Sequence, residues 1–225
     1  MKKYILVDLD NTLIDFNECA RNSIITNFKK FGLPYREDTL DIFIRENNKI
    51  WKRHENGEIG REHIRRDRWN IIFKVLDIDF DGAVMEEAFE YGVSQNACPI
   101  DGAYNLLDYL KGKYKLYVAS NGFRFVQENR LKIGDFNKYF DGVFVSEDFG
   151  FAKPSKEFFD NVIRELGNPP LDEILMIGDS ISADIIGAEN YGIDTVWFNK
   201  DGIENTSSVK SKYEVRKLAE IEAII

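Results

Sequence analysis

The chain has 225 residues, which allows one α/β domain with a large insertion or two small domains. Apolar residues make up 44% and charged residues 31%, which excludes a disordered chain, and no apolar run reaches the ~20 residues that span a bilayer. The net charge of −9 argues against a broad nucleic-acid-binding surface. The N-terminal apolar run is short and interrupted by Asp8, unlike a signal peptide, so we expect a cytoplasmic protein that binds neither nucleic acid nor membrane.

The first predicted element is a buried strand at Tyr4–Val7, where apolar residues form a short continuous run. From about Phe16 to Tyr91 the pattern changes, because apolar residues recur at helical spacing among many charges and no convincing strand occurs. We predict about four helices in this stretch, over Ala20–Phe31, Leu40–Arg53, Glu62–Val75 and Val84–Val93. Residues 16–95 would therefore form a helical domain inserted after the first strand.

Beyond the insertion, short apolar runs alternate with segments of helical period. The predicted strands are Lys115–Ala119, Val143–Val145, Ile174–Ile177 and Thr195–Phe198, and the helices between them are Phe125–Ile133, Lys156–Leu166 and Ala183–Tyr191. The tail, Lys210–Ile225, is expected to add a closing strand and a short helix. This alternation predicts an α/β fold with a doubly wound, Rossmann-like parallel sheet, formed by residues 1–15 and 96–225.

Acidic residues follow two of the predicted strands directly. Asp8 and Asp10 come after the first strand, and Asp179 and Asp184 come after Ile174–Ile177. Open α/β sheets bind ligands at the carboxyl ends of their strands, so these side chains are expected to meet at one edge of the sheet. Carboxylates held that close repel one another unless a hard cation with oxygen ligands joins them, and Mg²⁺ is the expected ion.

Two further features follow the other strands. Ser120 and Asn121, in Ser120-Asn121-Gly122, offer a hydroxyl and backbone N–H groups that suit phosphate oxygens, and Lys153 offers an ammonium that could neutralise a phosphate. Each feature alone has an ordinary explanation as a turn, a helix cap or an exposed lysine. Their occurrence together, in this order after four strands, indicates a phosphate site.

These residues resemble the four motifs of the haloacid dehalogenase (HAD)-like hydrolase superfamily. The motif DxDxT corresponds to Asp8 to Thr12, the Ser/Thr motif to Ser120, the lysine motif to Lys153, and GDxxxxD to Gly178 to Asp184. Within the superfamily, the sequences around Ser120, Lys153 and Asp194–Asn199 are similar to the intracellular 5′-nucleotidases that act on pyrimidine and noncanonical nucleoside monophosphates.

The resemblance implies a role for each motif residue. Asp8 would be the nucleophile and form an aspartyl phosphate, and Asp10 would be the general acid and base. Mg²⁺ would be held by the carboxylates of Asp8 and Asp179 and the backbone carbonyl of Asp10, with Asp184 supporting it indirectly. Phosphate would be bound by Ser120, Asn121 and Lys153. The helical insertion would act as a cap that selects the substrate.

Several alternatives stay open from the sequence. A sugar-phosphate or phosphoglycolate phosphatase and a phosphomutase share all four motifs. A haloacid dehalogenase is disfavoured, because the dehalogenases of this superfamily lack a carboxylate equivalent to Asp10. A non-catalytic binding module is also disfavoured, because every motif residue is present. We expect a small phosphomonoester as the only partner and a monomeric protein.

The helical insertion contains two tryptophans and a cluster of arginines that could contact a substrate. Tryptophans at helical spacing, such as Trp51 and Trp69, are more often core residues than base-stacking residues. The arginines, namely Arg61, Arg65, Arg66 and Arg68, are expected to pair with Glu55, Glu58 and Glu62 on a charged helical face. No residue of the insertion is therefore predicted to recognise a base.

Overall fold

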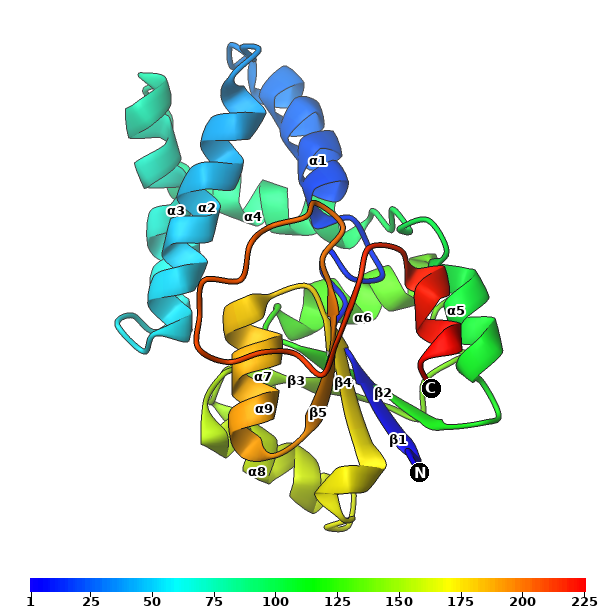
Figure 1. Cartoon of the computed structure of the whole chain (residues 1–225). Coiled ribbons are helices and arrows are strands. Elements are labelled where there is room, and N and C mark those ends of the chain that lie inside the picture. The colour runs from blue at the N-terminus through cyan, green and yellow to red at the C-terminus, as the bar shows by residue number, and fades with distance from the viewer. The chain divides into compact units, whose positions relative to one another are not determined.

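The structure is a computed structural model that describes residues 1–225. The chain divides into two compact units, each with its own interior (Figure 1). The first unit comprises Met1–Asp15 and Pro99–Ile225, and the second comprises Phe16–Cys98.

The first unit is built on a six-stranded parallel sheet with strand order β3-β2-β1-β4-β5-β6. The strands are β1 (Tyr4–Val7), β2 (Lys115–Ser120), β3 (Gly142–Val145), β4 (Ile174–Gly178), β5 (Asp194–Phe198) and β6 (Tyr213–Val215). In the centre of the sheet, β1 pairs with β2 on one side and β4 on the other, with Val7 opposite both Val118 and Ile177. The predicted α/β fold with a Rossmann-like parallel sheet is confirmed.

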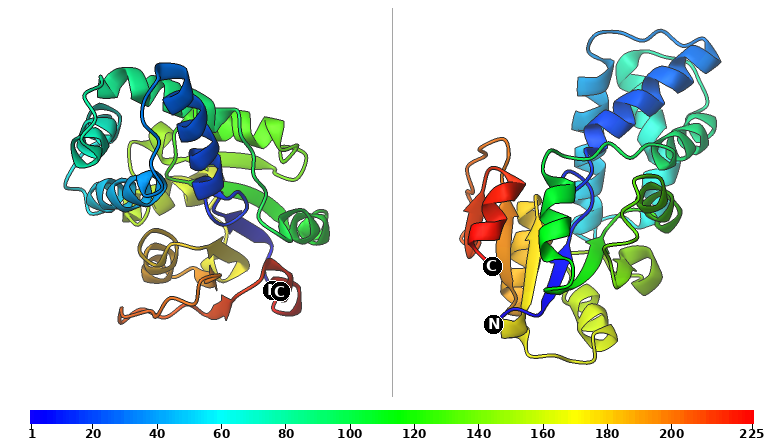
Figure 2. Two further views of the ribbon diagram at one scale, coloured as in Figure 1. Left: turned by 90° about the horizontal axis from the view of Figure 1, so that it is seen from above. Right: turned by 90° about the vertical axis from the view of Figure 1, so that its right-hand side faces the viewer.

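Helices cover both faces of this sheet, as parallel strands joined by right-handed crossovers require (Figures 1 and 2). These helices are α5 (Ala103–Leu110), α6 (Arg124–Ile133), α7 (Ser146–Phe149), α8 (Lys156–Glu165) and α9 (Gly187–Tyr191), with 3-10 turns η1 (Leu171–Glu173) and η3 (Leu218–Ala223) and a π-helical turn η2 (Ile181–Ile186). One core cluster joins Leu6 and Met176 of the sheet to Phe158 of α8 and Ala188 of α9. The central strands are thus buried and hold their carboxyl ends in fixed register.

The second unit consists of four helices, α1 (Phe16–Phe31), α2 (Thr39–Glu55), α3 (Arg61–Leu76) and α4 (Gly82–Ser94). Its core is aromatic, because the buried Trp69 packs against Phe28, Phe43, Phe73 and Phe89 with ring centroids 5.3 to 6.1 Å apart. Asp81 caps α4 by accepting a hydrogen bond from the N–H of Ala83 at 2.8 Å. Trp69 is therefore a core residue, as expected.

Three arginines of this unit form ion pairs with acidic residues outside the expected set. Arg65 bonds Glu90 at 2.8 Å and Arg66 bonds Asp67 at 2.7 Å. Arg68 is buried rather than part of an exposed cluster, and it forms an ion pair with Glu86. The expected charged helical face was thus wrong for Arg68, because the sequence spacing that places it beside Arg65 and Arg66 does not show which side of α3 faces the interior.

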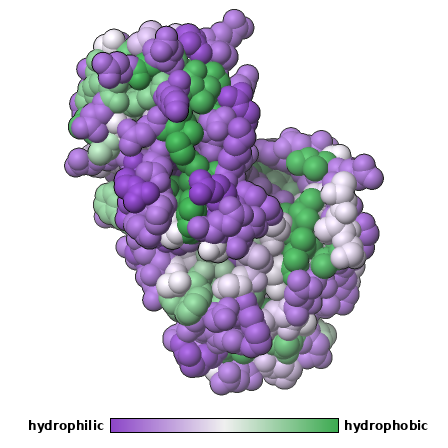
Figure 3. All heavy atoms as spheres, turned by 90° about the vertical axis from the view of Figure 1, so that its left-hand side faces the viewer, coloured by the Kyte–Doolittle hydropathy of each residue, from purple (hydrophilic) through white to green (hydrophobic).

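Two helices of the first unit were not predicted. In α5, apolar residues recur at 103, 106, 107 and 110 and all are buried, which is a helical pattern in a segment for which no element is predicted from the sequence. The short α7 follows β3 directly. No helix of the structure has the length and apolar character needed to cross a membrane. Polar side chains cover much of the surface of each unit seen in Figure 3, with apolar groups scattered between them.

Candidate active site

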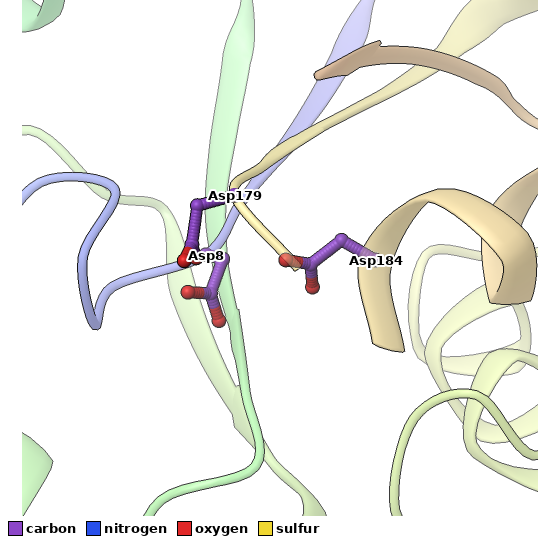
Figure 4. Close-up of side chains that lie close together, drawn as sticks. All are labelled: Asp8, Asp179 and Asp184. Carbon is purple, nitrogen blue, oxygen red and sulfur yellow. The ribbon is translucent and has the colours of Figure 1, made fainter. Parts of the chain in front are cut away.

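The site is built where the two central strands end. Because β1 and β4 run parallel and Val7 lies opposite Ile177, the residues that follow them, Asp8 and Asp179, leave the sheet side by side. The backbone N–H of Asp8 still donates to the carbonyl of Ile177 at 2.9 Å, so the sheet holds the first carboxylate in place. Figure 4 shows the carboxylates of Asp8 and Asp179 lying next to each other.

Asp184 reaches the same point from the π-helical turn η2 (Figure 4). One of its carboxylate oxygens, Oδ2, accepts the backbone N–H of Ser180 at 3.0 Å. A Cβ atom on Gly178 would lie 2.2 Å from that same oxygen, so only glycine at the end of β4 allows Asp184 to come this close. Oxygen atoms of Asp8, Asp179 and Asp184 lie within 4.8 Å of one another.

Lys153 supplies the positive charge among these carboxylates. Its Nζ donates to Oδ1 of Asp8 at 2.8 Å, to Oδ1 of Asp184 at 2.6 Å and to the carbonyl of Ala119 at 2.6 Å, and its side chain is 1% exposed. The amide of Asn121 fixes the backbone of Lys153 from both sides, accepting its N–H and donating to its carbonyl at 2.8 Å each. The side chain of Asn121 is thus engaged in positioning Lys153.

Burial sets the electrostatics of the cluster. It raises the pKa of Asp8 to about 7, with Lys153 opposing the rise and the charges of Asp184 and Asp10 adding to it. Burial, followed by repulsion from Asp8 and Asp184, raises the pKa of Asp179 well above its usual value. Burial opposes the charged form of Lys153, but the neighbouring Asp184 and Asp8 outweigh it and raise the pKa of the ammonium. Three carboxylates against one ammonium leave an excess of negative charge.

The donor set suits a hard divalent cation. Both oxygens of Asp184 already accept hydrogen bonds, one from Lys153 and one from Ser180. Asp8 accepts a hydrogen bond on Oδ1 only, and Asp179 accepts one on Oδ1 from Thr12 at 3.2 Å, so each has an oxygen open to an ion. Clustered carboxylate oxygens with excess negative charge are the ligands that Mg²⁺ and similar ions prefer. The cluster can therefore bind a metal ion.

The remaining predicted residues also lie at this edge of the sheet. Ser120 is the last residue of β2, and Asp10 lies in the loop after β1, where Asn11 adopts a left-handed backbone conformation with φ of 58°. Asp10 and Ser120 are joined through one side chain, because Nε2 of Gln127 donates to Oδ2 of Asp10 at 2.6 Å and to Oγ of Ser120 at 2.8 Å. The structure thus brings together all seven residues predicted from the motifs.

A family model described as haloacid dehalogenase-like hydrolase matches residues 2–192 of this chain. The chain belongs to this family. The HAD-like hydrolase described here is also 32% identical to the pyrimidine 5′-nucleotidase PynA of Streptococcus pneumoniae, over 95% of this chain and 90% of that protein. It is 28% identical to the pyrimidine 5′-nucleotidase YjjG of Escherichia coli, over 99% and 97% of the two chains. With such relatives, it is an enzyme of the HAD phosphatase type.

A solved structure shows the same fold over the whole length of this HAD-like hydrolase. The crystal structure of the HAD-hydrolase YfnB from Bacillus subtilis bound to magnesium superimposes with a TM-score of 0.93 at 31% identity. The superposition covers 99% of this chain and 98% of the other. The predicted resemblance to the HAD superfamily and to its pyrimidine 5′-nucleotidases is thereby confirmed.

Reasoning from the sequence missed two buried residues of this HAD-like hydrolase. Gln127 and Arg130 lie on α6, each is 1% exposed, and both contact Asp10. The available signal was their spacing of three residues, which places both side chains on one face of a helix that starts just after Ser120-Asn121-Gly122. Thr12 belongs to the first motif and donates to Asp179, a contact that the motif alone does not predict.

Proposed function

We propose that this protein is a Mg²⁺-dependent phosphatase that hydrolyses nucleoside 5′-monophosphates, with a preference for pyrimidine nucleotides, through an aspartyl phosphate on Asp8. The observation that carries the proposal is the placement of Asp8. Its buried carboxylate is held by Lys153 beside Asp179 and Asp184, at the carboxyl end of the central strand. A carboxylate fixed in this way can attack phosphorus, while the ammonium of Lys153 and a bound Mg²⁺ would offset the charge of the phosphate.

The first chemical step transfers the phosphoryl group to the enzyme. An oxygen of Asp8 forms a bond to phosphorus, and the bond between phosphorus and the ester oxygen breaks. The departing alkoxide takes a proton from Asp10, which lies two residues along the same loop. Lys153 and the Ser120 hydroxyl would contact the phosphoryl oxygens, with the backbone of the Ser120-Asn121-Gly122 turn beside them.

The second step returns the enzyme to its starting state. Asp10, now a carboxylate, takes a proton from water as the water oxygen bonds to phosphorus. The bond between phosphorus and Asp8 breaks, and inorganic phosphate leaves. The use of one carboxylate as the acid and then as the base keeps protons balanced over the two steps.

Asp8 and Asp179 would hold the metal ion through their open oxygens, with the Asp10 carbonyl as a further ligand. Asp184 would act indirectly, because Lys153 and Ser180 occupy its oxygens. When bound, Mg²⁺ would supply positive charge that offsets the carboxylates and the phosphoryl oxygens.

The nucleotide preference rests on the relatives PynA and YjjG, which are pyrimidine 5′-nucleotidases similar to this chain over nearly its full length. The choice of leaving group is assigned to the helical unit, Phe16–Cys98, whose length and separate core suit a substrate-selecting cap.

The test is phosphate release from purified protein. The substrates are pyrimidine and purine nucleoside 5′-monophosphates, ribose 5-phosphate, phosphoglycolate and glyceraldehyde 3-phosphate, each with Mg²⁺ and with EDTA. We expect Mg²⁺-dependent release that is fastest with pyrimidine nucleotides and lost in Asp8→Asn. The matched control is Asp172→Asn, which removes an exposed carboxylate near the amino end of β4 and should leave turnover unchanged.

The outcomes separate the two levels of the proposal. Turnover confined to sugar phosphates or phosphoglycolate would retain the chemistry of Asp8 and reject the nucleotide assignment. Interconversion of phosphate positions on a sugar without release would indicate a phosphomutase. Unchanged turnover in Asp8→Asn would reject the aspartyl phosphate.

A further inference from the structure

Two buried residues of α6 hold the Asp10 carboxylate by both of its oxygens. Arg130 Nη1 forms an ion pair with Oδ1 of Asp10, and Gln127 Nε2 donates to Oδ2 at 2.6 Å. Both α6 side chains are buried, whereas 29% of the Asp10 side chain is exposed. Arg130 and Gln127 therefore fix the orientation of the carboxylate, while part of it remains accessible to a substrate.

The orientation of the Gln127 amide follows from its contacts. Its Oε1 accepts a hydrogen bond from Nη1 of Arg130 at 3.1 Å, so its Nε2 must point the other way, toward Asp10 and Ser120. The two hydrogens of this nitrogen match these two acceptors. Arg130 thus fixes Gln127 as well as Asp10.

Ser120 is oriented by the same amide. Its Oγ accepts hydrogen bonds from Gln127 Nε2 at 2.8 Å and from the backbone N–H of Gly122 at 3.1 Å. A hydroxyl has two acceptor sites and one hydrogen, so Ser120 can then act only as a donor toward a third group. A Cβ on Gly122 would lie 2.2 Å from Gln127 Nε2, so glycine at this position makes room for the amide.

We propose that Gln127 and Arg130 are positioning residues for phosphoryl transfer, with Arg130 and Gln127 aligning the Asp10 carboxylate on the leaving group and Gln127 directing the Ser120 hydroxyl toward the phosphoryl oxygens. This inference rests on the proposed function, in which Asp10 donates a proton in the first step and, as the carboxylate that Arg130 and Gln127 hold here, accepts one from water in the second. The buried amide of Gln127 would thus contact both Asp10, which acts on the leaving group, and Ser120, which contacts the phosphoryl group.

A role in positioning predicts that the damage depends on the leaving group. An alkoxide such as a nucleoside 5′-oxygen needs a proton, whereas a nitrophenolate leaves without one. We expect Arg130→Met to lower kcat/KM for a pyrimidine nucleoside monophosphate by roughly 10²-fold, a typical contribution of general acid catalysis, and to change kcat/KM for p-nitrophenyl phosphate far less. Arg130→Lys, which keeps a charge but not the fork of donors, should recover part of the loss.

The second measurement is a double-mutant cycle with Asp10→Asn. If Arg130 acts through Asp10, adding Arg130→Met to Asp10→Asn should cause no further loss on the nucleotide, because the group being positioned no longer transfers a proton. The matched control is Lys132→Met, which removes an exposed cation from the last turn of the same helix. It should leave both substrates unaffected.

Gln127→Leu separates the two roles of the amide. Like Arg130→Met, it should lower kcat/KM more for the nucleotide than for p-nitrophenyl phosphate. In addition, it should raise the inhibition constant of inorganic phosphate severalfold, because the amide no longer orients the Ser120 hydroxyl. Arg130→Met should raise that constant less. Gln127→Leu also provides the test if Arg130→Met does not fold, with activity on p-nitrophenyl phosphate and the thermal melt showing which variants are folded.

Two results would overturn the inference while leaving the proposed function intact. One is an equal loss on the nucleotide and on p-nitrophenyl phosphate, and the other is an additive loss in the Asp10→Asn background. Either result would mean that Gln127 and Arg130 only stabilise the packing of α6 against the loop after β1. Wild-type protein that releases phosphate from neither substrate would reject the proposed function and the positioning role with it.

Discussion

Each unit of the molecule buries charged side chains, and the two clusters differ in their balance. In the helical unit, Arg68 faces Glu86, with side chains 3% and 6% exposed, and also donates to Asn47 at 3.1 Å. In the sheet unit, Lys153 faces Asp8 and Asp184, with Asp179 beside them. In the first cluster each carboxylate has its own guanidinium, because Glu90, which contacts Glu86, pairs with Arg65, whereas the second cluster has three carboxylates for one ammonium.

The difference distinguishes a structural pair from a binding site. Burial raises the pKa of Glu86 as it does that of Asp8, so desolvation opposes the charged form in both clusters. In the helical cluster the guanidinium groups of Arg68 and Arg65 balance the carboxylates of Glu86 and Glu90. The cluster around Lys153 keeps an excess of negative charge, which a bound cation would offset so that an anionic phosphate ester can approach Asp8.

The largest expected effect comes from the same isosteric change made in each cluster. Asp8→Asn should lower phosphate release by on the order of 10⁴-fold or more, because the nucleophile is gone. Asp8→Asn should also stabilise the metal-free protein near pH 8, since it removes an excess charge.

Glu86→Gln should have the opposite effects. It should keep activity on p-nitrophenyl phosphate and lower the free energy of unfolding, because Arg68 loses its counter-charge. Kinetic assays and urea unfolding in EDTA test both; a destabilised Asp8→Asn protein would contradict the comparison.

Removing the cation from each cluster is expected to cost a similar free energy of unfolding. Arg68→Met and Lys153→Met should each destabilise the metal-free protein by about 3–5 kcal/mol, because each leaves buried carboxylate without its partner. Mg²⁺ should then reduce the difference in free energy of unfolding between Lys153→Met and wild type, since the ion can replace the lost charge. Mg²⁺ should not reduce that difference for Arg68→Met. Adding Glu86→Leu to Arg68→Met should reduce it, because the unpaired carboxylate is then removed.

The third prediction concerns pH. The pKa of Asp8 is raised from 3.8 to about 7, so between these values the folded protein keeps a proton that the unfolded chain has lost. The contribution of this group to stability is therefore present at low pH and is lost as pH rises through about 7. The free energy of unfolding of the metal-free wild type, minus that of Asp8→Asn, should fall by up to about 4 kcal/mol between pH 4 and pH 8. Mg²⁺ should suppress this fall. A difference that does not change with pH in EDTA would contradict the raised pKa of Asp8.

The sheet and its carboxylates could be predicted because the relevant information is local. Buried parallel strands are continuous apolar runs, and Asp8 and Asp179 follow two such runs directly. Parallel pairing then brings those residues together without further assumptions. The helix α5 could also have been predicted, because its apolar residues have helical spacing.

The contacts of Asp10 could not be predicted in the same way. Gln127 and Arg130 lie 117 and 120 residues from it in the sequence, and both are residue types that usually face solvent. Which face of α6 turns toward the loop after β1 depends on how the helix packs on the sheet. Arg68 shows the same limit in the helical unit, where Arg65 and Arg66 of the same arginine cluster are exposed and Arg68 is buried.

The smallest expected effect tests whether the acidic cluster is tuned for a metal ion. Thr12 Oγ1 donates to Oδ1 of Asp179 at 3.2 Å and so orients the other oxygen of that carboxylate. Thr12→Val keeps the shape and removes the donor, and loss of such a partner typically weakens metal binding about 10-fold or more. Mg²⁺ titration followed by calorimetry should show this loss with an almost unchanged melt in EDTA. The matched control is Thr195→Val, a buried threonine of β5 that bonds Glu189 at 2.6 Å. Equal weakening in both variants would assign the effect to general destabilisation of the sheet unit rather than to the orientation of Asp179.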